Sequence, residues 1–319
     1  IMKYAWPWEL SRSGVLNMNR RNISYIGRYN QRKFYKRVDD KLITKQLALA
    51  NGIAVPDLIG VVHEQHKIQE IPAMVLDRSG FVIKPAKGSG GKGIMVITRV
   101  SNGCYYKPNG HEVTHSEIYR HVSNILSGLF SLGGKPDVAI VEGLIEFDPV
   151  FEGLSYEGVP DIRLIVFKGF PVMGMLRLST AASDGKANLH QGAVGVGLDI
   201  ATGSSLHAVQ FDLPVDKHPD THFPLSNIKV PHWETLLHTA SSAYEMCELG
   251  YLGTDMVLDK NKGPLLLELN ARPGLTIQIA NGRGILPRLK HVEAMKSSTM
   301  SVEERVAYAK KHFCSNPIF

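Results

Sequence analysis

Two apolar runs toward the C-terminal end constrain the fold of this chain most strongly. Thr254–Leu258 and Pro264–Leu269 are separated by a short polar turn, which predicts a hairpin of two largely buried strands. Asp255 lies in the first run, while Glu268 and Asn270 lie two residues apart and therefore point to one face of the second strand. A carboxylate buried in such a hairpin is costly unless it is paired or bound to a metal.

The polar residues of this hairpin are therefore the predicted metal ligands. If the two strands pair, the oxygens of Asp255, Glu268 and Asn270 converge, and such oxygens suit a hard cation such as Mg²⁺ that bridges nucleotide phosphates. The alternative is a half-exposed strand with polar alternation, but the second run is otherwise almost wholly apolar. The hairpin thus favours a magnesium site.

A second constellation combines glycines with lysines. Residues 84–93 read Lys-Pro-Ala-Lys-Gly-Ser-Gly-Gly-Lys-Gly, and a predicted strand leads into them. Glycine lets backbone amides approach a phosphate closely, and lysine supplies positive charge. The run does not fit a Walker A loop, and a strand rather than a helix follows it. The alternative to a phosphate lid over 87–93 is a mobile glycine-rich hairpin. The predicted phosphate-binding residues are Lys84, Gly88, Ser89, Gly90 and Gly91.

The rest of the chain mixes helices with β-branched or aromatic runs bounded by Gly and Pro. A 3.6-residue period predicts a helix over 233–247, whereas Thr180–Ser205 is a long Gly/Ala/Ser stretch. The strands look antiparallel, so the predicted fold class is α+β. Other helices are expected at about 40–50, 116–129 and 301–312, strands at Leu58–Val62, Gly80–Lys84, Gly93–Thr98, Val138–Ile145, Asp161–Phe167 and Phe170–Ser179, and a polar loop or hairpin at 102–115.

The net charge of +6 is concentrated near the N-terminal end. Between Ser11 and Val38 there are eight basic residues and no acidic one, so the remainder is slightly acidic. Residues 1–38 show no clear period, and aromatic residues are interleaved with the basic ones, as in proteins that bind single-stranded nucleic acid. A nucleic-acid-binding protein is therefore one alternative function, although we do not expect nucleic acid as the partner. The other alternative is a structural role, in which the basic segment packs on the slightly acidic remainder of the chain.

Cysteine usage and hydropathy indicate a cytoplasmic protein. Cys104, Cys247 and Cys314 are odd in number and far apart, which argues against a disulfide framework or a zinc knuckle and fits a reducing cytosol. The sequence contains neither an apolar run of 18 residues nor a secretory leader at its start. Met2 is interpreted as the natural start.

Several short motifs follow one another in a recognisable order. They are Asp40-Lys41, Gly52–Pro56, Phe81–Lys84 with the glycine run, Val141–Ile145, Asp161-Ile162-Arg163, Asn188–Gly192 and Leu267–Gly274. Over the span from Asp40 to about Ile285 the chain resembles the ATP-grasp superfamily, and within it the RimK-type and RimK-related alpha-L-glutamate ligase-like proteins. The resemblance implies an ATP-grasp fold of two lobes with ATP between them.

The resemblance also implies roles for individual residues. Arg177 and Lys84 would be catalytic, with Arg177 steadying the transferring phosphoryl group. Asp255, Glu268 and Asn270 would hold two magnesium ions, with Mn²⁺ as an alternative. The other implied ATP contacts are Lys41, Glu142, Gly143, Leu144, Ile145, Asp161, Lys186 and Asn188, and the implied substrate contacts are Arg163, His190 and Arg272.

The chain departs from the resemblance at its N-terminal end. RimK-type enzymes carry an α/β domain of about a hundred residues before the Asp-Lys motif, whereas about forty residues precede it here. That region walls part of the acceptor site in the family, so the acceptor and the glutamate specificity stay open. We expect residues 12–37 to fold back along the cleft, or to reach a partner subunit or partner protein, and to attract an acidic acceptor.

The predicted organisation is a basic arm over 1–39, a first ATP-grasp lobe over 40–140, a second lobe with the metal site over 141–295, and a C-terminal helix and tail over 296–319. The predicted function is an ADP-forming ligase that joins a small-molecule or peptide carboxylate to an amine through an acyl phosphate, with glutamate as a candidate acid. A phosphotransferase or a non-ligating ATP binder of the same fold is the other alternative.

Overall fold

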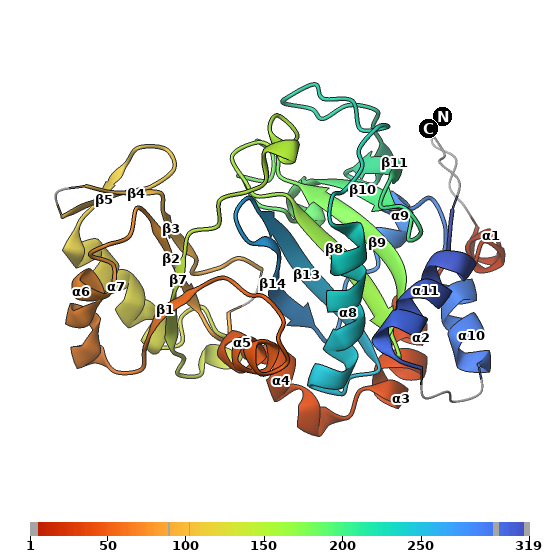
Figure 1. Ribbon diagram of the computed structural model, residues 1–319, viewed down its shortest axis with the longest axis horizontal. Helices are drawn as coiled ribbons and strands as arrows, with labels where there is room; N and C mark the ends of the chain where they lie inside the picture. The colour runs from red at the N-terminus through yellow and green to blue at the C-terminus, as the bar shows by residue number, and fades with distance from the viewer. Residues whose placement is uncertain (1–5, 89, 102, 296–299, 316–319) are drawn as a thin grey trace. The chain divides into compact units, whose positions relative to one another are not determined.

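A computed structural model describes residues 6–88, 90–101, 103–295 and 300–315 (Figure 1). The chain divides into two compact units. Unit 1 comprises the described parts of Ile1–Asp39, Leu47–Ala54 and Phe147–Phe319, and unit 2 comprises Asp40–Gln46 and the described parts of Val55–Glu146. Each helix in the described part of the chain is too short or too polar to span a bilayer.

Unit 2 is built on a four-stranded antiparallel sheet with the order β1-β7-β2-β3. A three-stranded antiparallel sheet has the order β4-β5-β6, and its strands β5 and β6 fall in the predicted loop or hairpin at 102–115. The strands are β1 (Leu58–Val62), β2 (Phe81–Pro85), β3 (Met95–Ile97), β4 (Arg99–Ser101), β5 (Cys104–Tyr106), β6 (Glu112–Val113) and β7 (Ala139–Gly143). The helices are α5 (Lys41–Ala50, shared with unit 1), η3 (Gln65–Glu70), α6 (Ile71–Met74), α7 (His115–Leu126) and η4 (Leu132–Gly134).

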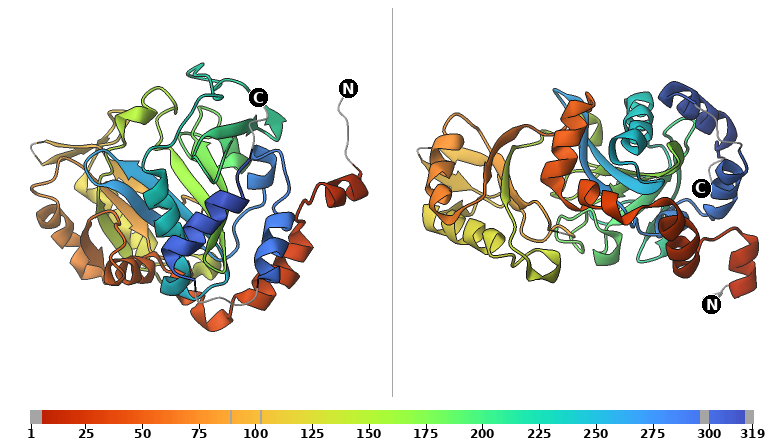
Figure 2. Two further views of the ribbon diagram at one scale, coloured as in Figure 1. Left: turned by 45° about the vertical axis from the view of Figure 1, so that its right-hand side comes forward. Right: turned by 90° about the horizontal axis from the view of Figure 1, so that it is seen from below.

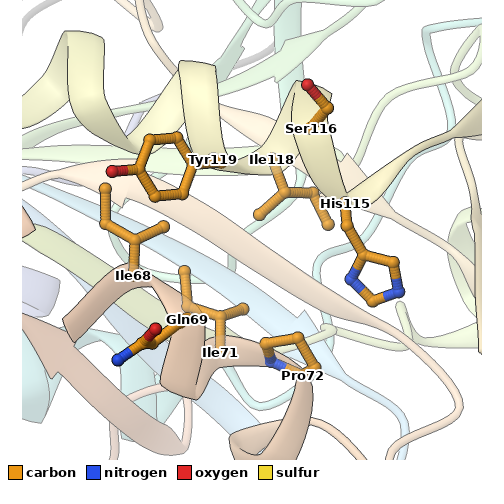
Figure 3. A pocket seen from close by; sticks show the side chains of 8 residues that line it. All are labelled: Ile68, Gln69, Ile71, Pro72, His115, Ser116, Ile118 and Tyr119. Carbon is orange, nitrogen blue, oxygen red and sulfur yellow. The ribbon is translucent and has the colours of Figure 1, made fainter. Parts of the chain in front are cut away.

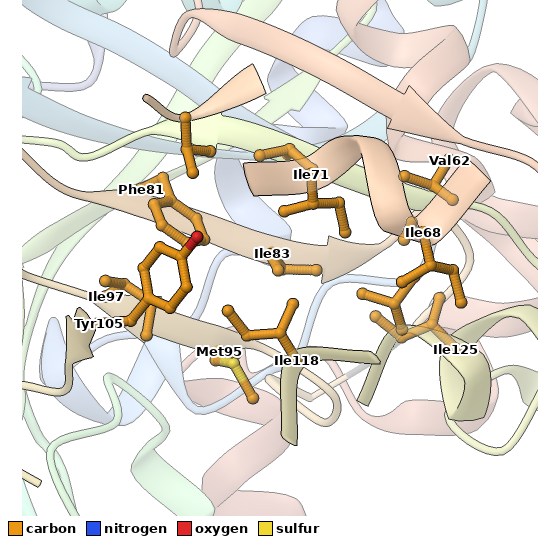
Figure 4. Packing of buried hydrophobic residues seen from close by; sticks show 14 of the residues in the cluster. Val62, Ile68, Ile71, Phe81, Ile83, Met95, Ile97, Tyr105, Ile118 and Ile125 are labelled. Carbon is orange, nitrogen blue, oxygen red and sulfur yellow. The ribbon is translucent and has the colours of Figure 1, made fainter. Parts of the chain in front are cut away.

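The two faces of this sheet have different chemistry because side chains alternate along each strand. Phe81 and Ile83 of β2 enter an apolar core with Ile118 and Ile125 of α7 (Figure 4). The helix begins at a capping box, in which Thr114 accepts from the Glu117 amide at 3.2 Å and Glu117 accepts from the Thr114 amide at 2.8 Å. Lys84, which follows Ile83 in β2, therefore points to the opposite face.

Unit 1 is built on a seven-stranded antiparallel sheet with the order β12-β11-β10-β9-β8-β13-β14. Helix α8 (Trp233–Cys247) crosses one face of the sheet, and α11 (Val302–His312) packs beside it (Figure 1). The strands are β8 (Asp161–Phe167), β9 (Phe170–Leu178), β10 (Val194–Leu198), β11 (Ser205–Gln210), β12 (Leu213–Pro214), β13 (Tyr251–Asp259) and β14 (Gly263–Asn270). The other helices of the main body are η5 (Pro149–Phe151), η6 (Leu189–Gln191), α9 (Ile277–Ala280) and α10 (Leu286–Ala294).

The sequence did not predict β10, β11 and β12, and β10 lies inside the Gly/Ala/Ser stretch. It pairs with both β9 and β11, so it is an interior strand of the sheet. A Cβ atom added at Gly197 would come within 2.3 Å of the Ala280 carbonyl oxygen, because α9 packs directly against this strand. Glycine is thus required by close helix–sheet contact, and its low strand propensity hides the strand in the sequence.

Residues 7–39 form short helices that belong to unit 1 and follow one another past α10 (Figure 2). Tyr25 and Tyr29 pack edge-on against Phe167, and Tyr29 donates to Glu293 of α10 at 2.7 Å. Most of the basic side chains are exposed. The segment therefore adds core residues on its inner side and charge on its outer side. Its elements are α1 (Pro7–Arg12), α2 (Met18–Arg20), η1 (Arg21–Ile26, a π-helix), α3 (Gly27–Tyr29), η2 (Arg32–Phe34) and α4 (Lys36–Asp39).

Most predicted elements are confirmed, including the helix over Trp233–Cys247 and the strand over Asp161–Phe167 at their predicted bounds. The N-terminal segment escapes a periodicity search because its buried residues do not follow a single helical period. A π-turn over Arg21–Ile26 shifts the phase within an otherwise helical run. The segment is also interrupted by extended residues such as Asn30.

Asn30 provides a direct test of whether this segment is part of the fold. Its buried side chain donates to the carbonyls of Tyr251 and Ala271 at 2.7 and 3.2 Å and accepts from the Tyr251 amide at 2.9 Å. Asn30→Ala leaves these backbone groups without that partner, so we expect the free energy of unfolding to fall by about 2–3 kcal/mol. Urea unfolding followed by circular dichroism measures the change. The exposed neighbour Gln31 is the control, since Gln31→Ala should change the same quantity by less than about 0.5 kcal/mol; equal effects would contradict a core role.

Candidate active site

A row of charged side chains crosses one face of the unit 1 sheet. In the antiparallel register Asp161 faces Arg177, Arg163 faces Asp255, and Asp255 faces Glu268. Opposed residues of antiparallel strands point to the same side, so side chains from four adjacent strands meet there. The row consists of Arg177 of β9, Asp161 and Arg163 of β8, Asp255 of β13, and Glu268 and Asn270 of β14.

Two guanidinium groups hold this row together. Arg163 forms a bidentate pair with Asp255, in which Nε donates to Oδ1 at 2.7 Å and Nη2 donates to Oδ2 at 2.5 Å. Arg177 makes an equally bidentate pair with Asp161, and its Nη2 also lies 3.0 Å from Asp255 Oδ2. Asp255 is 2% exposed and Arg177 is 9% exposed. Charges so well removed from water are tolerated because each one has a paired and hydrogen-bonded partner.

The neighbouring charges set the ionisation of the carboxylates. Burial alone would raise the pKa of Asp255, but Arg163 and Arg177 outweigh it and hold that pKa well below its usual range. Burial raises the pKa of Asp161 to about 6, although Arg177 favours its ionised form. Burial lowers the pKa of Arg177, but Asp161 and Asp255 outweigh burial, so that the pKa lies above its usual value. At neutral pH Asp161 and Asp255 are therefore ionised.

The three residues predicted to converge as metal ligands are in contact. Asn270 Nδ2 lies 3.1 Å from Asp255 Oδ2 and 3.4 Å from Glu268 Oε1. A bulge in β14 contributes to this arrangement, because Asp255 pairs with Glu268 whereas the next residue, Met256, pairs with Leu266. The extra residue turns Glu268 to the face opposite Leu266.

The chemistry of this donor set fits a hard cation. Asp255 and Glu268 offer carboxylate oxygens. Asn270 offers an amide oxygen if its side-chain amide is flipped by 180°, which exchanges Nδ2 and Oδ1. Within the described ranges no cluster of three or more His, Cys, Asp and Glu side chains is placed to hold a metal ion. The donor set proposed here combines two carboxylates with the side-chain amide of Asn270.

A second buried cluster occupies the charged face of the unit 2 sheet. Lys84 Nζ lies 2.7 Å from Glu142 Oε2, and Lys45 Nζ lies 2.8 Å from Glu142 Oε1. The sequence singled out Lys84 and Glu142 but missed Lys45. The available signal was its spacing, since Lys45 follows Lys41 by four residues and therefore lies on the same side of α5.

The predicted phosphate loop is anchored at its base. Asp137 accepts from the Lys87 amide at 2.9 Å and from the Ser131 hydroxyl at 2.6 Å, and Lys41 Nζ donates to the Gly88 carbonyl at 2.7 Å. Beyond this base Gly90 and Gly91 adopt positive φ with open space where a Cβ would lie. Ser89, also predicted to bind phosphate, lies outside the described residues.

The predicted adenine-reading segment begins in β7 and continues beyond it. Gly143 ends the strand, and its amide donates to the Asp57 carbonyl at 2.9 Å. Leu144 and Ile145 follow without regular structure. The Glu142 side chain points to the two lysines, so any contact with adenine from this segment would come from the backbone that follows.

Four predicted site residues have their recorded contacts outside the charged row. Lys186 pairs with Asp184 at 3.2 Å, Asn188 caps η6 by accepting from the His190 amide at 3.1 Å, and Arg272 stacks on Tyr35 at 5.1 Å. His190 is exposed. The loop that carries Lys186, Asn188 and His190 lies between β9 and β10.

Sequence reasoning also missed the residue that anchors this loop. His218 is fully buried, and its Nε2 lies 3.0 Å from the Ser179 carbonyl oxygen at the start of the loop. Its Nδ1 accepts from the amides of Asp220 and Thr221, which fixes the tautomer with the proton on Nε2. A lone histidine in a polar stretch gives no sequence signal for this role.

A cavity of about 390 Å³ lies on the other side of unit 2 (Figure 3). It is lined by side chains of η3, α6 and α7, among them Ile71, His115 and Tyr119. Its described lining residues include neither a lysine nor a carboxylate, and none belongs to the predicted site. The charged row and the lysine cluster are therefore the better candidates for chemistry.

Comparison with known proteins identifies relatives of this chain. A curated protein of Ectopseudomonas mendocina (strain ymp), named probable alpha-L-glutamate ligase, is 25% identical over 268 residues, which are 83% of this chain and 67% of the relative. Among solved structures, the ATP-grasp ligase PsnB complexed with minimal precursor is 13% identical with a TM-score of 0.46, over 83% of this chain and 62% of that chain. The D-alanine-D-alanine ligase from Coxiella burnetii is 13% identical with a TM-score of 0.46, over 87% and 60%.

The chain thus spans about three fifths of the length of these two solved structures. Structural likenesses of this size carry no argument about function. The decisive comparison is the match to a family described as sugar-transfer associated ATP-grasp, which extends over residues 20–294. This match confirms the predicted ATP-grasp resemblance. Because it covers most of the chain, the protein belongs to the sugar-transfer associated ATP-grasp family.

Proposed function

We propose that this protein is an ATP-dependent ligase that joins a carboxylate to an amine through an acyl phosphate and releases ADP. The observation that carries the proposal is the contact of Asp255, Glu268 and Asn270 beside the buried Arg177 and the partly buried Arg163. Such a row supplies oxygen donors for a divalent cation and guanidinium groups for phosphoryl oxygens. Membership of the ATP-grasp family supports the same reaction class.

Each charged residue of the row has a proposed task. Magnesium held by Asp255, Glu268 and Asn270 would neutralise phosphate charge. Arg163 orients Asp255 through its bidentate grip, so we assign it to positioning and not to the substrate. Arg177 Nη2 contacts Asp255 at 3.0 Å as well as Asp161, so this nitrogen could exchange Asp255 for a phosphoryl oxygen while Nε keeps its bond to Asp161.

The nucleotide contacts are proposed from both the loop and the lysines. Lys41 and Lys84 would meet the phosphates, the amides of Gly88, Gly90 and Gly91 would cover them, and residues 143–145 would frame adenine. Lys186 and Asn188 are proposed nucleotide contacts on the loop before β10. In this arrangement the protein positions the nucleotide and neutralises its charge, and it performs little covalent chemistry, as in other phosphoryl transfers.

The acid and the amine are proposed only as classes. His190 and Arg272 are exposed basic side chains that suit a carboxylate substrate. The name of the curated relative, probable alpha-L-glutamate ligase, supports testing glutamate first. The exposed basic residues of 12–37 favour an acidic peptide as a further acceptor to include.

Trapping the product tests the proposal. The chain is incubated with Mg²⁺ and ATP across a panel of amino acids and acidic peptides, phosphate release is measured, and the products are analysed by mass spectrometry. An amide product together with ADP is the expected result. A phosphoester with ADP would instead indicate a phosphotransferase, and nucleotide binding without turnover over the whole panel would indicate a non-ligating ATP binder.

Glu268→Gln should abolish turnover while the fold stays intact. The amide keeps the shape of the side chain but removes the negative charge proposed to hold the cation, so we expect phosphate release to fall by at least about 100-fold. The matched control is Glu152→Gln, which changes an exposed glutamate of the same unit and should keep wild-type activity. Full activity of Glu268→Gln in the presence of an unchanged thermal unfolding curve would contradict the metal assignment.

Hydrogen exchange tests the role of the glycine loop. The amides of Gly88, Gly90 and Gly91 should exchange rapidly without nucleotide, because two of them adopt positive φ in open space. Addition of saturating ATP should slow exchange there by roughly tenfold or more if phosphate covers these amides. Peptides from α11 serve as the internal reference. Exchange that is unchanged in the loop at saturating ATP would count against a phosphate-covering role.

A further inference from the structure

The lysine cluster of unit 2 contains more buried charge than nucleotide binding by one lysine requires. Lys45, Lys84 and Glu142 are 4%, 8% and 3% exposed. Glu142 lies between the two lysines, with one carboxylate oxygen 2.8 Å from Lys45 Nζ and the other 2.7 Å from Lys84 Nζ. Removing three charges from water is costly, so the arrangement calls for a reason beyond packing.

Backbone geometry explains how the three side chains meet. Val82 faces Glu142 and Lys84 faces Ile140 in the β2–β7 pair, so Lys84 and Glu142 are diagonal neighbours on one face. Helix α5 supplies Lys45, whose Nζ also donates to the Pro56 carbonyl. The ammonium group of Lys45 is therefore fixed beside Glu142 by the main chain.

The charges of the cluster do not cancel. Two ammonium groups and one carboxylate leave one positive charge. The carboxylate of Asp57 also attracts Lys45, but Asp57 is exposed, so water screens this attraction. Without Lys45, Glu142 and Lys84 would form a neutral pair. A nucleotide phosphate would then compete with Glu142 for Lys84 without the positive charge that the cluster has when Lys45 is present.

We propose that Lys45 is a positioning residue that compensates Glu142 and thereby leaves the positive charge of Lys84 available to a nucleotide phosphate. The inference rests on the proposed function, in which Lys84 meets the phosphates of ATP. Glu142 in turn contacts the Lys84 ammonium group through one carboxylate oxygen, and a glutamine at this position would keep an oxygen that can accept from Lys84. Burial lowers the pKa of Lys45, and the contact with Glu142 is the largest effect that opposes this shift.

The test is a charge-balance series measured by calorimetric titration of the full chain with ATP and with ADP. Lys45→Met should weaken binding of both nucleotides by at least about tenfold, because it converts Lys84 and Glu142 into a neutral pair. Lys45→Met combined with Glu142→Gln restores one positive charge and should bind within about threefold of the wild type.

Two controls separate this inference from the function on which it rests. Lys67→Met removes an exposed lysine of the same unit and should not change affinity, which excludes an effect of net charge. Lys84→Met should weaken binding. If Lys84→Met binds like the wild type, the proposed phosphate contact fails and the inference fails with it. If Lys84→Met is weak while Lys45→Met is not, only the role of Lys45 is overturned.

Thermal unfolding of the same variants distinguishes positioning from plain structural support. Lys45→Met leaves Glu142 with a single partner and should lower the melting temperature, whereas the double variant should fold because it contains no unpaired carboxylate. Recovery of nucleotide affinity in the folded double variant supports the proposal. A double variant that folds but still binds tenfold more weakly than the wild type would overturn it.

Discussion

The Arg177 guanidinium is the group on which the charged row of unit 1 depends. It is buried between Asp161 and Asp255, and it links the pair on β9 and β8 to the pair on β8 and β13. Removing it would leave two carboxylates without a shared partner in a place from which water is excluded, and an uncompensated buried charge is among the most destabilising changes a fold can suffer. The same guanidinium is the one proposed to meet a phosphoryl group, so stability and function draw on one residue.

Alternation along the strands explains how charge and core coexist in both sheets. In unit 2, Phe81 and Ile83 enter the apolar core while Lys84 faces the other way toward Glu142. In unit 1, α8 packs over one face of the sheet while the charged row occupies the other. In unit 2 the two sets of side chains thus divide between core and site, whereas in unit 1 the face with the charged row also carries Phe167 and Tyr251, which pack against Tyr25. A change of register by one residue would exchange the two sets.

This alternation also decides what could be predicted from the sequence. Glu268 and Asn270 could be placed on one face because a two-residue spacing suffices, and their contact with Asp255 follows from the hairpin. The bulge that turns Leu266 away from Glu268 could not be predicted, because it depends on pairing across strands. Lys45 and His218 escaped for a related reason. Their partners, Glu142 and the Ser179 carbonyl, lie far along the chain, and no local pattern records such a contact.

The charged row of unit 1 and the lysine cluster of unit 2 differ in the sign of their formal net charge. In the row of unit 1, three carboxylates face two guanidinium groups and leave one negative charge, whereas in unit 2 two ammonium groups face one carboxylate and leave one positive charge. Buried clusters with a residual charge attract a ligand of the opposite sign, and in a low dielectric that attraction is strong. The row thus favours a cation and the lysine cluster favours an anion. A magnesium–nucleotide complex carries both kinds of charge, so the signs of the two clusters agree with the proposed assignment of a cation to the row and of phosphates to the lysine cluster.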